Sequence, residues 1–308
     1  MKRILVVGDV MVDRYYNVNR TKSNPECKDG YCLINPIHEG DCMGGAANVA
    51  ANIQSMGGNV TLLCTTGDTL LLDILKYAKI KVMNAFDKDF ICRKDRYVYT
   101  EEREEKILIR IDQDPLPNRE GRKDALLRML RHNIEQYDII VTSDYDKGTL
   151  FPKLLDVVAS SGKLWIADPK KVFYAAYKNS SDIIIKMNAY EAKEFSFESS
   201  VHCDTCSRNK IQDAYTWIVT VAKSIQGVAI MTNGEKSVLR YRASDNHVKM
   251  APVKKVHVKS VIGAGDVFTA SLAVSMSDGI SIDESISIAI ERCSSLISTQ
   301  ERTLVYKR

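Results

Sequence analysis

A run of small residues that ends in an aspartate, Gly263-Ala264-Gly265-Asp266, is the stretch of this sequence best suited to chemistry. Glycine and alanine let the backbone approach a ligand closely, and the free N–H groups at the start of a helix attract anions. An aspartate repels a phosphate that is merely held at such a site. It makes sense there if it takes a proton from a hydroxyl that attacks the phosphoryl group. This pattern therefore suggests phosphoryl transfer with Asp266 as the base.

The same residues also fit a simpler interpretation, a glycine-rich turn in which Asp266 only caps the following helix. Local chemistry alone does not decide between the two. Two common nucleotide-binding motifs are excluded, because the sequence has no GxxxxGK[ST] loop and residues 263–268 lack the third glycine of the dinucleotide fingerprint.

Apolar runs typical of buried strands alternate with helical patterns along most of the chain. We expect strands at residues 4–7, 60–64, 138–142, 164–167, 183–185 and 227–231, and helices at 45–56, 124–136, 150–159, 265–276 and 282–296. This order predicts an α/β fold, a doubly wound and mostly parallel sheet with helices on both faces. Residues 14–40 and 91–112 alternate polar and apolar side chains, which indicates antiparallel strands with one exposed face. We expect them to form a small inserted β-lid.

The composition limits the class of protein. Of the 308 residues, 45% are hydrophobic and 27% are charged, which is enough for a large core and unlike a disordered chain. The net charge of +4 is spread along the chain, without the basic patch typical of nucleic-acid binding. No stretch approaches the roughly 18 to 20 apolar residues of a membrane helix, and residues 1–9 do not resemble a signal peptide. We expect a cytoplasmic protein with no nucleic-acid or membrane partner.

Eight cysteines are too few for a disulfide scaffold in a chain of this length and suit a reducing compartment. Cys203 and Cys206, preceded by His202, form the one CxxC motif, and Cys27 with Cys32 is the only candidate for a second ligand pair of a zinc site. Reduced, unpaired thiols are the favoured interpretation.

Several motifs in a fixed order indicate a family. The GAGD sequence at a late helix, together with Gly44-Gly45-Ala46-Ala47-Asn48, resembles the ribokinase-like (PfkB) carbohydrate kinases. The resemblance is greatest to the branch that phosphorylates D-glycero-D-manno-heptose 7-phosphate for ADP-heptose and lipopolysaccharide core synthesis. The motifs that carry it are GDVMVDRY at 8–15, GGAANVA at 44–50, SDYDKG at 143–148 and DPK at 168–170. It implies one ATP- and Mg²⁺-dependent kinase domain over residues 1–308.

The resemblance assigns roles around the sugar. Asp266 would be the base on the sugar 1-hydroxyl, and Gly263, Ala264 and Gly265 would form the anion hole. The residues that would hold the sugar hydroxyls are Asp13, Gly44, Gly45 and Asn48, since Asp and Asn side chains suit vicinal diols. The alternative for residues 44–47 is tight helix packing, and Asp9 is expected to be structural.

Charged residues elsewhere are candidates for the phosphates. The resemblance implies that Lys170, Asn188, Thr232 and Gly234 contact the nucleotide and that Glu191 orders Mg²⁺ through water. The alternatives are a solvated lysine at 170 and a plain helix start at 188–191. Candidates for the sugar 7-phosphate are the lid cations Lys94, Arg96 and Arg110; otherwise these are solvated charges. Exposed edges of the lid strands predict a homodimer.

The sequence also departs from the family pattern. Ser260-Val261-Ile262 stands where Asp-x-Thr is usual, so the family's monovalent-cation site is left open. Residues 25–32 and 300–303 differ as well, which bears on sugar recognition and on contacts to adenine. Two further hypotheses therefore remain: a kinase of another sugar, sugar phosphate or nucleoside, and a catalytically weak binding protein.

Overall fold

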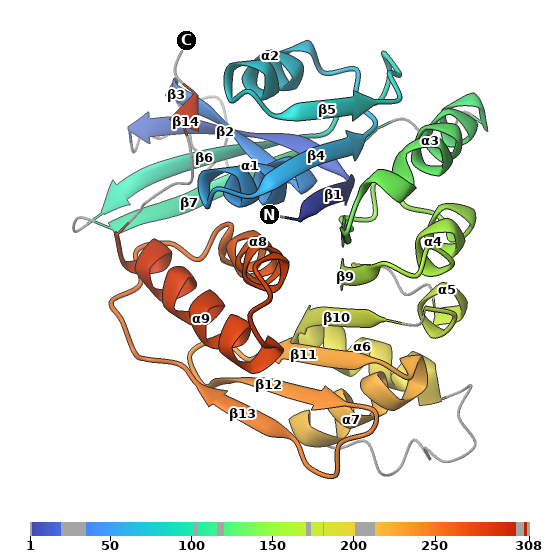
Figure 1. Ribbon diagram of the computed structural model, residues 1–308. Helices are drawn as coiled ribbons and strands as arrows, with labels where there is room; N and C mark the ends of the chain where they lie inside the picture. Colours follow the sequence, from blue (N-terminus) through green and yellow to red (C-terminus); the bar gives the residue numbers. More distant parts are fainter. Residues whose placement is uncertain are drawn as a thin grey trace.

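The main sheet has nine strands in the order β13-β12-β11-β10-β9-β8-β1-β4-β5 (Figure 1). The structure is a computed structural model that describes residues 2–19, 35–101, 104–115, 120–170, 174–180, 182–200, 213–299 and 305–306. Neighbouring strands from β5 to β11 run parallel, and β12 and β13 continue the sheet antiparallel. The bounds are β1 (Arg3–Gly8), β4 (Asn59–Cys64), β5 (Lys81–Asn84), β8 (Ile139–Ser143), β9 (Leu164–Asp168), β10 (Ile183–Asn188), β11 (Val228–Thr232), β12 (Ser237–Arg242) and β13 (Lys249–Pro252).

Helices cover both faces of this sheet, because both sides of its central strands are apolar. In β1, Ile4 and Val6 face one buried cluster, and Leu5 and Val7 face the other. The first cluster packs against α1 (Ala46–Ser55), α2 (Thr69–Tyr77), α8 (Ala264–Ser277) and α9 (Ile282–Thr299). The second packs against α3 (Glu120–Asn133), the short helix η1 (Ile134–Gln136), α4 (Pro152–Ala159), α5 (Tyr174–Lys178), α6 (Ala189–Ser200) and α7 (Ala214–Ile225). The predicted α/β fold is confirmed.

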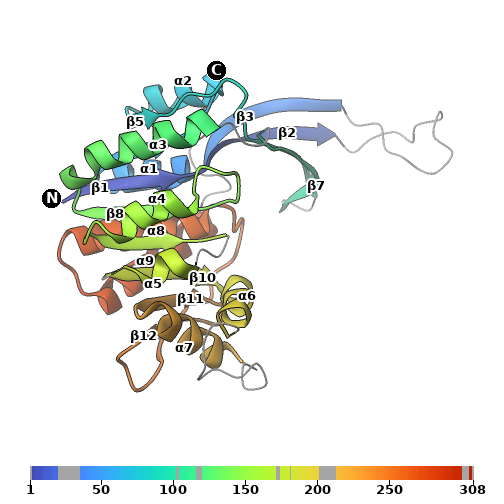
Figure 2. The ribbon, with the colours of Figure 1, turned by 90° about the vertical axis from the view of Figure 1, so that its right-hand side faces the viewer.

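A second sheet of five strands, the lid sheet, has the order β14-β3-β2-β6-β7. Its strands are β2 (Val10–Asn19), β3 (Asn35–Gly45), β6 (Arg93–Glu101), β7 (Glu104–Gln113) and β14 (Val305–Tyr306). Figure 2 shows β2 and β3 extending well beyond the body of the molecule. Only Asp9 separates β1 of the main sheet from β2 of the lid sheet. The lid therefore grows directly out of the centre of the main sheet.

Two expectations for the strands need correction. The lid strands are not all antiparallel, because β2 and β6 pair in parallel, with Asp13 opposite Lys94 and Tyr15 opposite Arg96. The two strands come from separate segments of the chain, so no hairpin fixes their direction. The antiparallel extension of the main sheet by β12 and β13 was not among the predicted strands. Within the described part of the chain, no helix is both long and apolar enough to cross a membrane.

Candidate active site

Helix α8 begins at the glycine-rich turn, and this fixes the position of Asp266. Gly263 is the N-cap residue and has φ of 80°, a left-handed conformation that favours glycine. Asp266 lies in the first turn of the helix, and the N-cap has no side-chain hydrogen bond. Asp266 is therefore not the cap residue, and its role as a base stays a prediction. The N–H of Ala264 donates to the carbonyl oxygen of Val261 at 3.2 Å. Other N–H groups in the first turn of a helix lack partners within the helix and can donate to an anion.

The carboxylate of Asp266 is buried and held at both oxygens. The amide of Asn48 donates to Oδ2 at 2.7 Å, and the hydroxyl of Tyr145 donates to Oδ1 at 2.8 Å. Burial raises the pKa of Asp266 to about 6, against the hydrogen bonds from Asn48 and Tyr145, which lower it. Among the nearby charges, Asp168 raises this pKa and Lys186 lowers it. A carboxyl with a pKa near neutrality is well suited to accept a proton from an alcohol and later release it.

Asp266 opens into a cavity of about 220 Å³ between the lid sheet, the turn after β8 and the starts of α1 and α8. The cavity brings together many of the residues predicted for the sugar site, namely Asp13, Gly45, Asn48, Lys94, Arg96, Gly263 and Asp266. Met11, Tyr15, Cys42, Tyr145 and Ile262 complete its lining. Side chains far apart in the sequence thus meet around one carboxylate.

Gly44 and Gly45 have packing reasons to be glycine. A Cβ on Gly44 would lie 2.7 Å from Cγ of Met11 and 3.1 Å from Oδ2 of Asp13. Gly45 has φ of 60°, and a Cβ there would lie 2.3 Å from the carbonyl oxygen of Asp9. Their absent side chains leave room for Asp13 and for the start of α1. Contact with a sugar stays a prediction for both glycines.

The lid contributes cations to this cavity. Arg96 is buried and forms an ion pair with Asp13, with Nη1 2.9 Å from Oδ1. Nζ of Lys94 lies 5.0 Å from the centre of the Tyr145 ring, and burial lowers the pKa of Lys94. Arg110 lies opposite Arg96 in the lid sheet but does not line the cavity, and it pairs with Asp112 at 2.8 Å. The structure thus brings two of the three predicted phosphate cations to the site.

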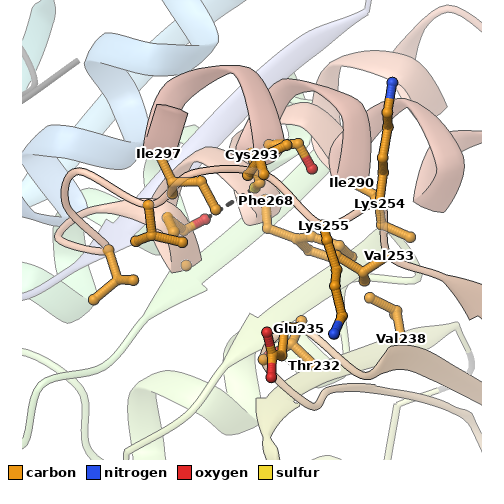
Figure 3. A pocket seen from close by; sticks show the side chains of 17 residues that line it. Thr232, Glu235, Val238, Val253, Lys254, Lys255, Phe268, Ile290, Cys293 and Ile297 are labelled. Carbon is orange, nitrogen blue, oxygen red and sulfur yellow. Dashed lines mark hydrogen bonds between the residues drawn. The ribbon is translucent and has the colours of Figure 1, made fainter. Parts of the chain in front are cut away.

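A second cavity, of about 280 Å³, lies on the other side of the glycine turn (Figure 3). Ala264 and Gly265 line this cavity, whereas Gly263 and Asp266 line the first. Its walls include Phe268 of α8 and further apolar side chains: Val238, Val253, Val258, Ile290 and Ile297. Such walls suit a flat, apolar ring system.

Polar residues complete the second cavity. Thr232 and Gly234, predicted to contact a nucleotide, both line it. In Figure 3, Lys255 points toward Glu235 while Lys254 points the opposite way. The ammonium group of Lys255 is therefore directed toward the loop after β11.

Lys170, Asn188 and Glu191 line neither cavity. Asn188 and Glu191 cap the start of α6 reciprocally: the backbone N–H of Asn188 donates to Oε2 of Glu191, and the backbone N–H of Glu191 donates to Oδ1 of Asn188. Nζ of Lys170 lies 3.2 Å from Oε1 of Glu191. For Asn188 and Glu191 this is the geometry of a plain helix start, the alternative interpretation of their sequence. Their roles toward a nucleotide stay predictions.

Lys186 and Asp168 form a buried pair that the sequence did not identify as functional. Lys186 is 5% exposed, and its Nζ lies 2.9 Å from Oδ2 of Asp168, which also accepts a hydrogen bond from Thr269. Burial opposes the charge of Lys186, but Asp168 outweighs it and raises the pKa. A Cβ on Gly265 would lie 3.1 Å from this Nζ, so the ammonium group sits against the glycine turn. The available signal was a lysine within the apolar strand β10.

The described residues do not contain a ready-made metal site, since no three His, Cys, Asp or Glu side chains converge among them. Mg²⁺ is usually bound by one or two carboxylates together with substrate phosphates and water. Glu191 fits such a site only through water, because its two oxygens already contact Lys170 and the N–H of Asn188. The cysteines and the histidine of the zinc alternative, Cys27, Cys32, His202, Cys203 and Cys206, lie outside the described residues.

Comparisons with known proteins show the family and the fold of the chain. Residues 1–304 match the pfkB family of carbohydrate kinases. The bifunctional protein HldE of Shewanella amazonensis is 28% identical over 293 residues, covering 93% of this chain and 58% of that protein. HldE of Campylobacter jejuni is 26% identical over 304 residues, covering 96% of this chain and 61% of that protein. The chain thus spans about 60% of the length of these relatives.

Solved structures share the fold. Phosphofructokinase-2 of Escherichia coli, in complex with substrates and products, superposes with a TM-score of 0.73 at 16% identity, covering 96% of this chain and 93% of that one. A carbohydrate kinase of Agrobacterium tumefaciens has a TM-score of 0.66 at 18% identity, with coverage of 98% and 94%.

Proposed function

The chain belongs to the pfkB family of carbohydrate kinases, and from this premise we propose that it transfers the γ-phosphoryl group of ATP to the anomeric hydroxyl of D-glycero-D-manno-heptose 7-phosphate. The product would be the 1,7-bisphosphate, a precursor of ADP-heptose and of the lipopolysaccharide core. The observation that carries the proposal is the glycine turn between two cavities, one with Asp266 and lid cations, the other with apolar walls. A sugar phosphate in the first and ATP in the second would meet at this turn.

The proposed reaction needs one proton acceptor and several positive groups. The sugar oxygen attacks the γ-phosphorus, the bond to the β–γ bridging oxygen breaks, and Asp266 takes the hydroxyl proton while ADP leaves. The N–H groups of the turn and the ammonium of Lys186 would offset negative charge on the transferring group. Mg²⁺ bound to the nucleotide would supply further charge compensation. A lid closed over the sugar would exclude water and so limit hydrolysis of ATP.

A phosphorylated sugar is favoured over a neutral one by the lid. Lys94 and Arg96 both line the first cavity. Arg96 is already paired with Asp13, whereas Lys94 has no carboxylate at ion-pair distance among the described residues, and its contact is the face of Tyr145. Even partial burial of an ammonium without an ion-pair partner is unfavourable, so a substrate phosphate would offset that cost. The relatives named HldE support the heptose among sugar phosphates.

A kinase of another sugar phosphate is the second candidate. Ser260-Val261-Ile262 replaces the family's Asp-x-Thr, and Ile262 lines the first cavity, where the sugar would bind. A cytoplasmic location and a homodimer formed through the lid belong to the same proposal.

The test measures ADP release with heptose 7-phosphate, unphosphorylated heptose, fructose 6-phosphate and ribose. We expect heptose 7-phosphate to give the highest kcat/KM. Asp266→Asn should lower kcat by a factor on the order of 1,000 or more and leave ATP affinity, measured by calorimetry, nearly unchanged. A preference for an unphosphorylated sugar would reject the 7-phosphate site, and an active Asp266→Asn variant would remove the proposed base.

A further inference from the structure

The turn that follows β8 is held by a carboxylate remote from it in sequence. Asp9 is fully buried and accepts three backbone hydrogen bonds, from the N–H groups of Tyr145 at 2.9 Å, Lys147 at 3.0 Å and Thr149 at 2.9 Å. The turn includes a left-handed residue, Asp146, with φ of 55°. Its irregular backbone therefore depends on Asp9 for partners that neighbouring strands would otherwise supply.

This turn carries the phenol that reaches the proposed base. Tyr145 donates to Oδ1 of Asp266 at 2.8 Å, while Asn48 donates to Oδ2. Asn48 is itself oriented by Asn52, whose amide donates to Oδ1 of Asn48 at 3.0 Å. With a donor on each oxygen, the carboxylate cannot rotate freely about its Cβ–Cγ bond. Both donors come from outside α8, so the main sheet and α1 fix the direction in which the base points.

We propose that Tyr145 is a positioning residue for Asp266 and that Asp9 is the anchor that keeps Tyr145 in reach of it. The inference rests on the proposed function, in which Asp266 accepts the sugar proton. In this arrangement Tyr145 does not itself exchange a proton with the substrate. It favours the ionised form of Asp266 and holds it toward the cavity.

Other charged groups around the carboxylate define what Tyr145 adds. Asp168 and Lys186 face Asp266 from β9 and β10, and their effects on its pKa oppose each other. The lid side of the cavity contributes Asp13, Lys94 and Arg96. Tyr145 is the one neutral hydroxyl donor to the carboxylate among the described residues, so its loss is expected to leave these charges in place and raise the pKa of Asp266.

The test is Tyr145→Phe, which keeps the ring and removes the hydroxyl. Its matched control is Tyr241→Phe, because the hydroxyl of Tyr241 donates to the carbonyl of Asp245 away from the site. We expect kcat to fall roughly 10- to 100-fold. Because the pKa of Asp266 is about 6, the acidic limb of the kcat/KM profile is expected near that pH in the wild type and about one pH unit higher in Tyr145→Phe. KM for ATP should not change. The control should keep the wild-type limb, and an unshifted limb in Tyr145→Phe would overturn the proposal.

A direct titration separates this inference from the proposed function. Selective ¹³C labelling of aspartate carboxyls gives the pKa of Asp266 by NMR, with Asp266→Asn identifying its signal. A higher pKa of Asp266 in Tyr145→Phe supports the positioning role of Tyr145 even if no tested sugar is turned over. An unchanged pKa of Asp266 rejects that role even in an active kinase.

The role of Asp9 is tested by Asp9→Asn, whose amide supplies fewer acceptors for the three N–H groups. We expect the same upward movement of the limb as in Tyr145→Phe, and no additional movement in the double variant. A folded Asp9→Asn protein with a wild-type limb would reject the anchor. If Asp9→Asn does not fold, hydrogen exchange of the wild type replaces it: slow exchange at Tyr145, Lys147 and Thr149 is expected, and fast exchange would overturn the assignment.

Discussion

Asp266 combines two properties that oppose each other at the level of a single residue. Its carboxyl is 6% exposed, so ionisation within the fold is unfavourable, yet the proposed reaction needs the ionised form. Hydrogen bonds from Asn48 and Tyr145 recover part of this cost and leave the pKa at about 6. In the proposed reaction, the buried carboxyl would therefore serve activity at the expense of stability.

This cost predicts a pH dependence of stability. Because the pKa of Asp266 is raised from 3.8 to about 6, the folded protein binds the proton more tightly than the unfolded chain. Its contribution is favourable at low pH and is lost as the pH rises through about 6. Relative to Asp266→Asn, the wild type should therefore gain about 1 kcal/mol of unfolding free energy between pH 7 and pH 5. Urea unfolding of both proteins at the two pH values measures it.

Asp156→Asn, a change at an exposed aspartate of α4, is the control for this comparison. Its difference from the wild type should hardly change between the two pH values. A difference for Asp266→Asn that stays constant, or that moves in the opposite direction, would contradict the raised pKa.

The first turn of α8 organises the site at the level of elements. Gly263 starts the helix, Ala264 and Gly265 face the apolar cavity, and Asp266 faces the polar one. The thiol of Cys293 in α9 donates to the carbonyl oxygen of Ala264 at 3.2 Å, which ties the turn to the neighbouring helix. One helix start therefore serves both cavities.

Gly265→Ala tests this dual role. The new Cβ would lie 3.1 Å from Nζ of Lys186, the mobile end of a side chain, so the fold should tolerate it while the ammonium is displaced from the turn. We expect kcat to fall about tenfold, equivalent to about 1.4 kcal/mol, with a nearly unchanged melting temperature. Gly121→Ala is the matched control, because a Cβ there meets nothing within 4 Å. Equal activity of the two variants would show that Lys186 does not act at the turn.

The sequence predicted the helices and strands better than it predicted the tertiary contacts between them. The glycine turn and Asp266 were identifiable because four adjacent residues carry their chemistry together. The contacts of Asp266 join residues 121 and 218 positions apart in the chain, for Tyr145 and Asn48 respectively, and tertiary packing alone sets such contacts. Lys186 stands out in the sequence as a lysine within an apolar strand, but only the fold shows that it pairs with Asp168 and lies against the glycine turn.

Arg110, for which the sequence predicted a phosphate contact, forms an ion pair with Asp112 and does not line the first cavity, so that contact stays a prediction. Spacing along a strand indicates which face a side chain shares, not which partner it takes. Likewise, the parallel pairing of β2 and β6 could not be read from alternation, which is the same for both strand directions.

At the scale of the whole molecule, the lid sheet ends in an apolar edge. Strand β7 lies at one edge of this sheet, with β14 at the other. Four apolar side chains of β7 are about half exposed: Ile107, Leu108, Ile109 and Ile111. An apolar edge strand with unpaired backbone groups favours association with another strand. Strand β7 is linked to the first cavity through β6, since Arg96 of that cavity lies opposite Arg110 of β7. Ile109 and Ile111 flank Arg110 in the strand and therefore point to the other face of the lid sheet.

We predict that the protein is a homodimer joined through β7 and that Ile109→Lys shifts it to the monomer. Sedimentation velocity at micromolar concentration measures the change. We also expect a higher KM for the sugar in this variant and little change in KM for ATP. The reason is that lid strands line the first cavity, whereas none of them lines the second among the described residues. Phe86→Lys, at another exposed apolar side chain, should leave the dimer intact. A monomeric wild type would reject the prediction.

A single residue connects the central strand of the body to the first strand of the lid. Asp9 occupies this junction and, through its carboxylate, also grips the turn that carries Tyr145. A movement of the lid sheet would therefore act on Asp9, the residue that holds the turn of Tyr145 and, through it, the orientation of Asp266. In the proposed reaction, binding of the sugar under the lid and orientation of the proton acceptor would therefore depend on the same residue.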